Sequence, residues 1–568
     1  MGDNNIRTSA LSKSAHEDLK TTLLEIWEAV LGRSPVETQD DFFELGGDSL
    51  LAAQIIVRIE KQLNVRLTSQ EFLEKSTISE LADYLPQLQD REAQVIRASR
   101  RTGPVPVSDM QEAQLGRLAE WKLLPLTHPQ QNICLGYRIT GALDEEALRR
   151  SIECICQRHE IFRTHFDITT SPPTQVIEQS PTLDYAVIDL SESDEERREI
   201  SLSNQIKAIK QQPFDCLNAA LIRFHLLRLA PTDFVFIITT DHLIMDLWSI
   251  GLLQDEISEC YSSFSQQQPY APDPPDIQYA DFSIWQRDFY PQKEQQALTY
   301  WRAVLTGLKS RGLEIPLSLP RPEKFEYRTA ARSRDLTPLR EPMRRFCENH
   351  RVTAFSFCLS VYVVLLYKLS LETSMLVVVP SAQRNRIELE RVMGRFARSL
   401  VLRVNVNSGL PFEKFVGEVA AAVLAAQSNL EIHNVVFNGL LPAMVYGEDQ
   451  HRSCPISYVG FSFDRHKQLK LASLDVRNFP VNTASGPWFD LNARILTRDD
   501  ETCLYLIYNP DSYTSESSQL IVELYEEIMR AALRHEQVSV DDLVSLTTSP
   551  LDYSSSPRGA QPGTNVSG

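Results

Sequence analysis

Residues 239–249, TTDHLIMDLWS, constrain the fold of this chain more than any other segment. They follow the apolar run 234–238, FVFII, which has the length and composition of a buried strand. Beyond them, apolar side chains share one face of a predicted helix: Ile250, Leu253, Ile257 and Tyr261. The segment therefore predicts a strand, a loop and a helix, with His242 and Asp246 on the loop. Such loops often present catalytic groups, but an H-x-x-x-D pair alone is too common to establish a function.

The size and charge of the chain limit the classes of protein to which it can belong. Its 568 residues suffice for about two to four domains, each with its own core. The 75 acidic and 57 basic residues give a net charge of −18. That excess of acid argues against a surface for nucleic acid or for an anionic membrane, so we expect neither as a partner.

The nine cysteines show no paired spacing that would suggest a metal site. Cys154 and Cys156 form a C-x-C without a second pair, so we expect no metal, and free thiols in a reducing compartment. The first residues, MGDNNIRTSALSKSAHEDLK, contain no apolar core, which argues against a secretory signal. The longest apolar run, residues 355–367, is too short to span a bilayer and predicts a buried helix. We therefore expect a cytoplasmic protein.

Residues 15–87 have the pattern of a small helical bundle. The first helix carries apolar residues at helical spacing: Leu19, Leu23, Ile26, Trp27, Val30 and Leu31. Gly46 and Gly47 allow a tight turn, and Ser49 follows at the start of a second helix. The free N–H groups and the dipole of a helix N-terminus stabilise an anion, so a phosphodiester on Ser49 suits this place. On these residues alone, Asp48 or Ser49 could equally serve as a helix cap.

Residues 41–85, which begin DFFELGGDSLLAAQ and end STISELADYL, resemble the peptidyl carrier proteins of nonribosomal peptide synthetases along their whole length. In that family the Ser of the GG-x-S-L motif carries a 4′-phosphopantetheine arm. The resemblance implies this cofactor on Ser49, with Gly47 and Asp48 beside the attachment point. It also implies a phosphopantetheinyl transferase as a partner.

The rest of the chain divides into a linker and a large α/β region. Residues 88–106 carry two prolines and no apolar periodicity, which is typical of a linker. After them strand-like and helix-like segments alternate, and we expect one lobe over 107–290 and a second over 291–545. Residues 546–568 are rich in Ser, Gly and Pro and are predicted to be disordered.

Five motifs of the large region resemble, in the expected order, those of nonribosomal peptide synthetase condensation domains. They are RHEIFRTHF, DHLIMDLWS, YADFSIWQ, MGRFARSLVLR and the FDL at residues 489–491. The resemblance implies a small four-helix carrier bundle followed by a condensation domain of two chloramphenicol-acetyltransferase-like α/β lobes in a V. The active site would lie in a tunnel between the lobes, and two carrier arms would enter it from opposite faces.

The resemblance also implies roles for individual residues. His242 stands at the second His of the family's H-H-x-x-x-D-G motif and is the expected catalytic residue. Asp246 is expected to pair with Arg163 and so to support the loop, and Asp241, at the first His position, is expected to support it too. Leu247 replaces the Gly of the motif. Further departures from the family patterns are Leu115, Arg398 and Ser399.

The implied reaction is attack of an amine on a carrier-bound thioester, giving an amide (or, with a hydroxyl acceptor, an ester). His242 would act as a base or orient the nucleophile. Two alternatives stay open: a non-catalytic docking domain that recruits tailoring enzymes, and an epimerisation domain, although no E-G-H-G-R-E-like segment occurs.

The chain also contains no adenylation motif, Walker loop or thioesterase elbow. We therefore expect other synthetase modules, or carrier and adenylation proteins in trans, to supply the acyl groups, unless the chain is a piece of a longer synthetase. The acceptor amine would be carrier-bound or free.

Overall fold

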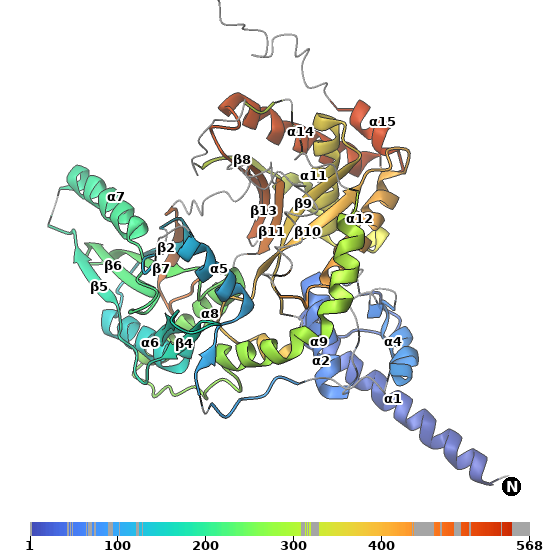
Figure 1. Ribbon diagram of the computed structural model, residues 1–568, viewed down its shortest axis with the longest axis horizontal. Helices are drawn as coiled ribbons and strands as arrows, with labels where there is room; N and C mark the ends of the chain where they lie inside the picture. The colour runs from blue at the N-terminus through green and yellow to red at the C-terminus, as the bar shows by residue number, and fades with distance from the viewer. Residues whose placement is uncertain are drawn as a thin grey trace, which may run out of the picture.

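The computed structural model describes most of the chain between residues 3 and 547. The residues outside the description are 1–2, 43–44, 46, 48, 64, 66, 68–70, 73–74, 89–94, 102, 121–123, 128, 193, 308–312, 314, 316, 320–328, 385, 434–435, 437–458, 466–467, 482–489, 499–500, 536 and 548–568. The predicted features that fall on them are Gly46, Asp48, Phe489 and almost all of the C-terminal tail. In the described part, a small helical domain precedes two α/β lobes that stand side by side (Figure 1).

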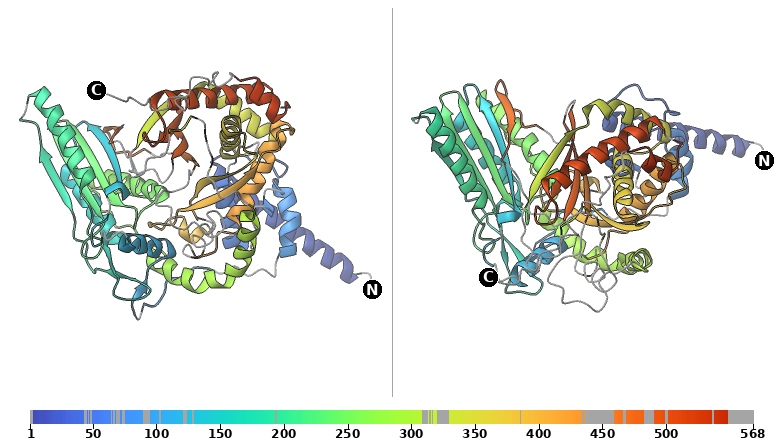
Figure 2. Two further views of the ribbon diagram at one scale, coloured as in Figure 1. Left: turned by 45° about the horizontal axis from the view of Figure 1, so that its top comes forward. Right: turned by 90° about the horizontal axis from the view of Figure 1, so that it is seen from above.

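The N-terminal domain is a helical bundle around an aromatic cluster. Its elements are α1 (Asp3–Leu31), α2 (Ser49–Leu63), α4 (Ile78–Tyr84) and the 3-10 turn η1 (Leu85–Leu88). The buried Trp27 ring lies 5.6 Å from the Phe42 ring and 6.0 Å from the Phe72 ring, between centroids. Figure 2 shows that the N-terminal part of α1 extends away from this cluster. The predicted helical bundle is confirmed.

The first lobe is built on a mixed five-stranded sheet. Its order is β12-β2-β7-β6-β5, with β5 parallel to β6 and the other neighbours antiparallel. The strands are β2 (Asn132–Thr140), β5 (Tyr185–Asp189), β6 (Ile222–Ala230), β7 (Asp233–Asp241) and β12 (Asp475–Phe479). The helices and turns are α5 (Asp109–Glu120), α6 (Glu145–Arg158), α7 (Glu195–Gln211), α8 (Leu247–Ser265), η2 (Pro129–Gln131) and η3 (Glu160–Arg163). A separate antiparallel sheet orders β1 (Val105–Pro106), β4 (Thr174–Ile177) and β3 (Thr164–Asp167).

The central strand β7 explains the continuous apolar run in the sequence. Phe234, Phe236 and Ile238 enter the core that includes side chains of α6 and α8. Val235 and Ile237 enter a second core, on the α7 side of the sheet. Because both faces of the strand are covered, it shows no polar alternation over these five residues. The C-terminal end of β7 leads into the His242 loop, and α8 begins directly after that loop.

The second lobe is built on a six-stranded sheet. Its order is β10-β9-β11-β13-β14-β8; β9 and β13 each pair parallel with β11, and the other pairs are antiparallel. The strands are β8 (Ala330–Asp335), β9 (Ser374–Ser381), β10 (Arg398–Asn405), β11 (Val459–Arg465), β13 (Leu491–Arg498) and β14 (Glu501–Tyr508). The helices and turns are η4 (Thr337–Leu339), α10 (Arg340–His350), α11 (Ala354–Ser370), η5 (Ile387–Leu389), α12 (Phe412–Gln427), α14 (Ser515–Arg534) and α15 (Val540–Ser545).

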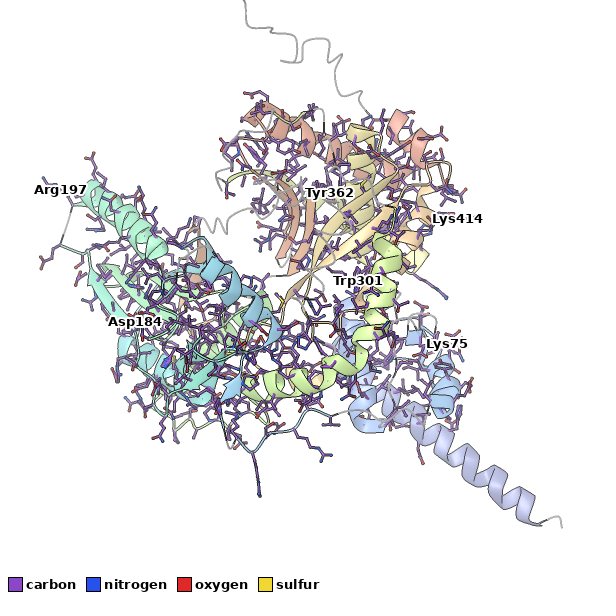
Figure 3. All side chains as sticks on the ribbon, viewed as in Figure 1. Lys75, Asp184, Arg197, Trp301, Tyr362 and Lys414 are labelled. Carbon is purple, nitrogen blue, oxygen red and sulfur yellow. The ribbon has the colours of Figure 1, made fainter. Side chains whose placement is uncertain are left out.

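The helix α9 (Tyr279–Leu305) joins the two lobes. It contains Pro291, which removes a helical hydrogen bond, and Figure 1 shows the helix bent along its course. Tyr279 at its start is buried in the core of the first lobe, and Trp301 near its end is buried in the core of the second. The Trp301 indole N–H donates to the carbonyl of Asn429 over 2.8 Å, and Figure 3 places this side chain against the second lobe.

The two lobes exchange segments on both sides of the predicted boundary at residue 290. That boundary falls inside α9. Two later segments then return to the first lobe: residues 389–396 contribute to its core, and β12 adds a strand beside β2. The exchange covers an edge of the first sheet that would otherwise present unpaired backbone groups. An apolar pattern read along the chain does not reveal which lobe receives a segment.

The long apolar run 355–367 lies inside α11 and is mostly buried, which confirms the predicted buried helix. Side chains from α12 and α14 belong to the same core. No single helix of the described chain is long and apolar enough to cross a membrane. The helical segments 337–350 and 354–370 together reach the length and hydropathy of a membrane span, by length and composition only. The two segments meet at an angle of 105°.

Candidate active site

His242 lies in the loop that joins β7 to α8. Its ring Nδ1 is 2.7 Å from the carbonyl oxygen of Met245, and its backbone N–H donates to the carbonyl of Gln131 over 3.2 Å. A carbonyl oxygen only accepts hydrogen bonds, so Nδ1 must carry the proton and Nε2 must retain its lone pair. The loop therefore fixes one imidazole tautomer, in which Nε2 is the acceptor.

The surroundings of His242 disfavour its protonation. Withdrawal from water is the largest cause and the positive charge of Arg395 is the next; they outweigh the Met245 carbonyl and lower the pKa of His242 to about 4. At neutral pH the ring is thus neutral, although its side chain is still partly exposed. A neutral imidazole with a free Nε2 lone pair can accept a proton or a hydrogen bond.

Asp241 lies directly before His242 and is fully buried. Its Oδ1 accepts the backbone N–H of Leu243 over 2.7 Å and the side-chain amide of Gln114 over 3.4 Å. Burial raises the pKa of Asp241 to about 6, against the lowering effect of these hydrogen bonds and of the Arg395 charge. The carboxyl group thus supports the turn that carries His242, in accordance with the supporting role expected from the sequence.

Glutamines of α5 and η2 support the same turn from another side. Gln111 donates its side-chain amide to the carbonyl of Leu243 over 3.1 Å. Gln114 donates to the side-chain oxygen of Gln131, whose backbone carbonyl accepts the His242 N–H. All three glutamine side chains are buried. The backbone of both His242 and Leu243 therefore has hydrogen-bond partners in this turn.

Asp246 caps the helix that follows the turn. Its Oδ1 accepts the N–H of Ser249 over 2.9 Å and lies 3.4 Å from Nη2 of Arg384. Its Oδ2 accepts the N–H groups of Phe396 and Ala397 over 2.9 and 3.0 Å. Burial alone would raise the pKa of Asp246, but the Arg384 charge and these N–H groups outweigh it and lower the pKa. Asp246 is therefore an ionised, saturated anchor for the loop.

The prediction that Asp246 pairs with Arg163 is wrong, because its cation is Arg384. Arg163 ends the turn η3, and its guanidinium donates to the carbonyl of Glu178 and lies 4.0 Å from the carboxylate of Glu160. β3 begins directly after Arg163, so this side chain lies beside the three-stranded sheet. Arg384, which follows β9 in the second lobe, reaches the loop instead.

Residues 384–397, which we call the cross-lobe segment, connect the second lobe to the His242 loop. Arg384 donates to the Ser249 hydroxyl over 2.8 Å and to the carbonyls of Leu389 and Val392 over 2.5 and 2.6 Å. Its guanidinium also lies 3.7 Å from the centroid of the Phe396 ring. One buried side chain thus shapes the cross-lobe segment and binds the start of α8.

A close packing contact continues this connection. The Ser249 hydroxyl accepts the Gly394 N–H over 3.0 Å and donates to the Gly394 carbonyl over 2.8 Å. The Tyr279 ring occupies the space beside Gly394, where a Cβ would lie 1.9 Å from it. The same ring lies 4.9 Å from the Phe396 ring, between centroids. Tyr279 is therefore a packing residue between the two lobes.

Leu247 and Arg398, two residues that depart from the family patterns, occupy different environments in the fold. Leu247 is the first residue of α8, and its side chain is 39% exposed next to the loop. Arg398 is buried and donates to the carbonyls of Leu430 and Ile432 over 2.7 and 2.8 Å. Arg398 also lies 3.7 Å from the carboxylate of Asp109 on α5, so it joins the second lobe to the first. Leu247 instead adds an apolar side chain near the candidate catalytic residue.

In the carrier domain, Ser49 is the first residue of the 15-residue helix α2, as predicted. The first-turn N–H groups of such a helix have no partners within the helix, which suits a phosphodiester on this residue. Gly47 is required for a different reason from the one expected: a Cβ there would lie 2.4 Å from the Phe42 ring. The Gly47 N–H also donates to the Phe42 carbonyl over 2.9 Å. The residues present therefore fit an arm attached at Ser49.

Arg384 and the three glutamines are site residues that the sequence reasoning missed. A signal for two of the glutamines was available, since Gln111 and Gln114 are three residues apart, a spacing that places them on one face of the helix α5. Arg384 follows an apolar strand, which marks it only as one of many polar residues at strand ends. Its role depends on the packing of the second lobe against the first.

Two family models match this chain. The model described as "Condensation domain" matches residues 103–550, and the model described as "Phosphopantetheine attachment site" matches residues 21–85. The phosphopantetheine match includes Ser49 and supports the predicted cofactor. The condensation match covers both α/β lobes and the His242 loop.

Curated relatives and solved structures agree with these matches. Tyrocidine synthase 3 of Brevibacillus parabrevis is 26% identical over 95% of this chain and 8% of its own length. Cyclosporin synthetase simA of Tolypocladium inflatum is 26% identical over 93% of this chain and 3% of its own length, so the chain spans a small part of each of these two relatives. The X-domain in complex with OxyB from teicoplanin biosynthesis has a TM-score of 0.66 at 20% identity, covering 80% of this chain and 98% of that one. The first condensation domain of the calcium-dependent antibiotic synthetase has a TM-score of 0.62 at 16% identity, covering 79% and 100%. The chain therefore belongs to the condensation-domain family of nonribosomal peptide synthetases, with a phosphopantetheine carrier domain in front of it.

Proposed function

We propose that this chain forms an amide bond, by attack of an acceptor amine on an acyl thioester presented at Ser49. The supporting observation is the bond from His242 Nδ1 to the Met245 carbonyl, which leaves Nε2 as an acceptor on a neutral ring. An α-amine has a pKa near 8, so it must lose a proton to attack and to form a stable amide. A fixed, neutral imidazole supplies an acceptor for that proton.

The reaction forms one C–N bond, breaks one C–S bond and moves one proton. The amine nitrogen forms a bond to the thioester carbonyl carbon, the C–S bond breaks, and a thiol is released. The proton leaves the nitrogen and reaches the departing sulfur. Because a pKa of about 4 makes His242 a weak base, we propose that Nε2 first orients the amine by a hydrogen bond. It accepts the proton once C–N bond formation has made the nitrogen acidic.

The phosphopantetheine arm supplies the thiol to which the acyl group is joined. The chain's own contribution is to carry that arm at the start of α2 and to fix the His242 tautomer. A phosphopantetheinyl transferase to attach the arm, and other synthetase modules to supply acyl groups, are the partners of this proposal.

The test is a small donor thioester, such as an acyl N-acetylcysteamine, offered with a panel of amines to the full chain without its arm. Amide formation should fall about 100-fold or more in His242→Ala, while the unfolding curve stays unchanged. The matched control is His535→Ala, a histidine that follows α14 in the second lobe. No amide from any amine, with a correctly folded chain, would favour the docking-domain alternative.

A further inference from the structure

The cross-lobe segment touches the carrier domain as well as the His242 loop. Arg386 lies 3.8 Å from the carboxylate of Glu60 on α2 and 3.7 Å from that of Glu431. Its guanidinium is 4.6 Å from the centroid of the Trp285 ring on α9, and its side chain is 4% exposed. The guanidinium also lies 5.1 Å from the centroid of the Phe289 ring, so a buried cation of the condensation domain contacts two rings of α9 and two carboxylates, one of which belongs to the carrier.

Neighbouring contacts tie the carrier and the linker to the same region. The backbone N–H of Ile96, in the linker, donates to the Glu388 carboxylate over 3.1 Å. α2 packs against the turn η5 within the cross-lobe segment. A second ion pair joins Asp41 of the carrier to Arg351 after α10, over 3.3 Å. Figure 1 accordingly shows α2 beside α9 and below the second lobe.

The same short stretch of backbone is bound to the catalytic loop. Arg384, two residues before Arg386, contacts Asp246 and the Ser249 hydroxyl. The Trp248 indole N–H donates to the carbonyl of Glu390 over 3.0 Å. Within residues 384–390, contacts to the carrier, the linker and the His242 loop therefore alternate.

We propose that Glu60 of the carrier domain is a positioning residue for the condensation centre. Its docking on Arg386 stabilises the conformation of the cross-lobe segment in which Arg384 anchors Asp246 and thereby orients His242. The centre is then most active while its own carrier is docked, and less able to consume thioesters when the carrier has left. This inference rests on the proposed function and deepens it.

The physical reason lies in the charge around Arg386. Without the Glu60 carboxylate, Arg386 keeps Glu431 but loses the negative charge that α2 places beside it, so hydration draws the guanidinium toward water. Within the described part of the cross-lobe segment, η5 is the sole helical turn that resists the resulting backbone shift. The contact from Arg384 to Asp246 is the longest of those that Asp246 makes, so it is the first to be lost.

The test compares Glu60→Gln and Glu60→Lys with the wild type, using the full chain without its arm and the soluble acyl N-acetylcysteamine donor. This donor does not need carrier docking for delivery, so a pure docking role would leave its turnover unchanged. We expect kcat to fall about three- to ten-fold with KM nearly unchanged. Glu25→Lys, the same charge change at an exposed position of α1, should have no effect.

Hydrogen exchange gives a second readout that does not require activity. The amides of Ser249, Phe396 and Ala397 all donate to Asp246, so they should exchange faster in Glu60→Lys than in Glu25→Lys. Unchanged exchange together with unchanged soluble-donor kcat would overturn the proposal, as would faster turnover in Glu60→Lys. If the wild type proves inactive with every amine, the proposed function fails, and the exchange data alone decide the coupling.

Discussion

Arg384 of the second lobe and Asp246 of the first form a buried ion pair, with Nη2 and Oδ1 3.4 Å apart. Both side chains are almost fully buried, 2% and 1% exposed. The pair joins the end of β9 to the N-terminus of α8, so it connects the two lobes at the loop that carries His242. The orientation of the candidate catalytic residue therefore depends on the contact between lobes.

The first prediction concerns this pair. Arg384→Ala should lower the free energy of unfolding by about 3–5 kcal/mol, because Asp246 is left buried without its cation. Arg163→Ala should cost about 1 kcal/mol at most, since Arg163 has no contact with Asp246. Urea unfolding of the two variants measures the difference. A larger loss in Arg163→Ala would contradict the assignment.

The second prediction follows from the raised pKa of Asp241, about 6 in the folded chain against 3.8 for an ordinary Asp. Between these values the folded state binds more protons than the unfolded state, so this group makes stability fall as pH rises from about 4 to 6. Asp241→Asn keeps an oxygen for the Leu243 N–H and removes the buried charge. It should therefore stabilise the chain by about 2–3 kcal/mol at pH 7 and flatten the pH dependence, as measured by urea unfolding at pH 5 and pH 7. An equal loss of stability at both pH values would exclude this account.

The third prediction concerns the pH dependence of His242. Its pKa is about 4 in the folded chain and 6.5 ordinarily, so the unfolded state binds more protons between these values. Its contribution to stability is thus lost as pH falls through this window and is fully present above it. Turnover with an amine of pKa below about 5 should stay flat from about pH 5.5 to pH 8. An inflection near pH 6.5 that disappears in His242→Ala would show an ordinary histidine instead.

The fourth prediction tests the packing between lobes. Gly394→Ala places a Cβ 1.9 Å from the Tyr279 ring, a residue buried against Phe396. We expect a loss of about 1–3 kcal/mol, as for overpacked cores, and a large loss of turnover. The matched control is Gly417→Ala on α12, where nothing lies within 4 Å of the new Cβ. That variant should gain about 1 kcal/mol, so equal melting temperatures for the two would refute the packing argument.

Much of the fold could be predicted because local patterns were strong. The apolar run 234–238 lies within β7, the helix after Asp246 matches α8, and the apolar run 355–367 lies within α11. The Ser49 helix start was predictable because two glycines and a Ser precede an amphipathic run. Each of these features depends on residues close together in the sequence.

The parts that could not be predicted depend on distant residues. Asp246 was assigned the wrong arginine, because the family resemblance that implied Arg163 does not determine which cation reaches a buried carboxylate in this fold. Similarly, the return of β12 to the first sheet depends on the open edge of β2, some 340 residues earlier in the chain. Gly47 was correctly selected, but for a tight turn instead of the close approach of the Phe42 ring. Side-chain packing between lobes and within the carrier decided all three.

The most direct test of the central claim is the intact mass of the chain after acylation at Ser49 by a promiscuous phosphopantetheinyl transferase and an acyl-CoA. On addition of an acceptor amine, the wild type should lose the acyl mass in a single turnover, and an amide of that acyl group should appear. His242→Ala should load equally and keep its acyl group. Loading without transfer to any amine, or equal transfer in His242→Ala, would contradict condensation at this site.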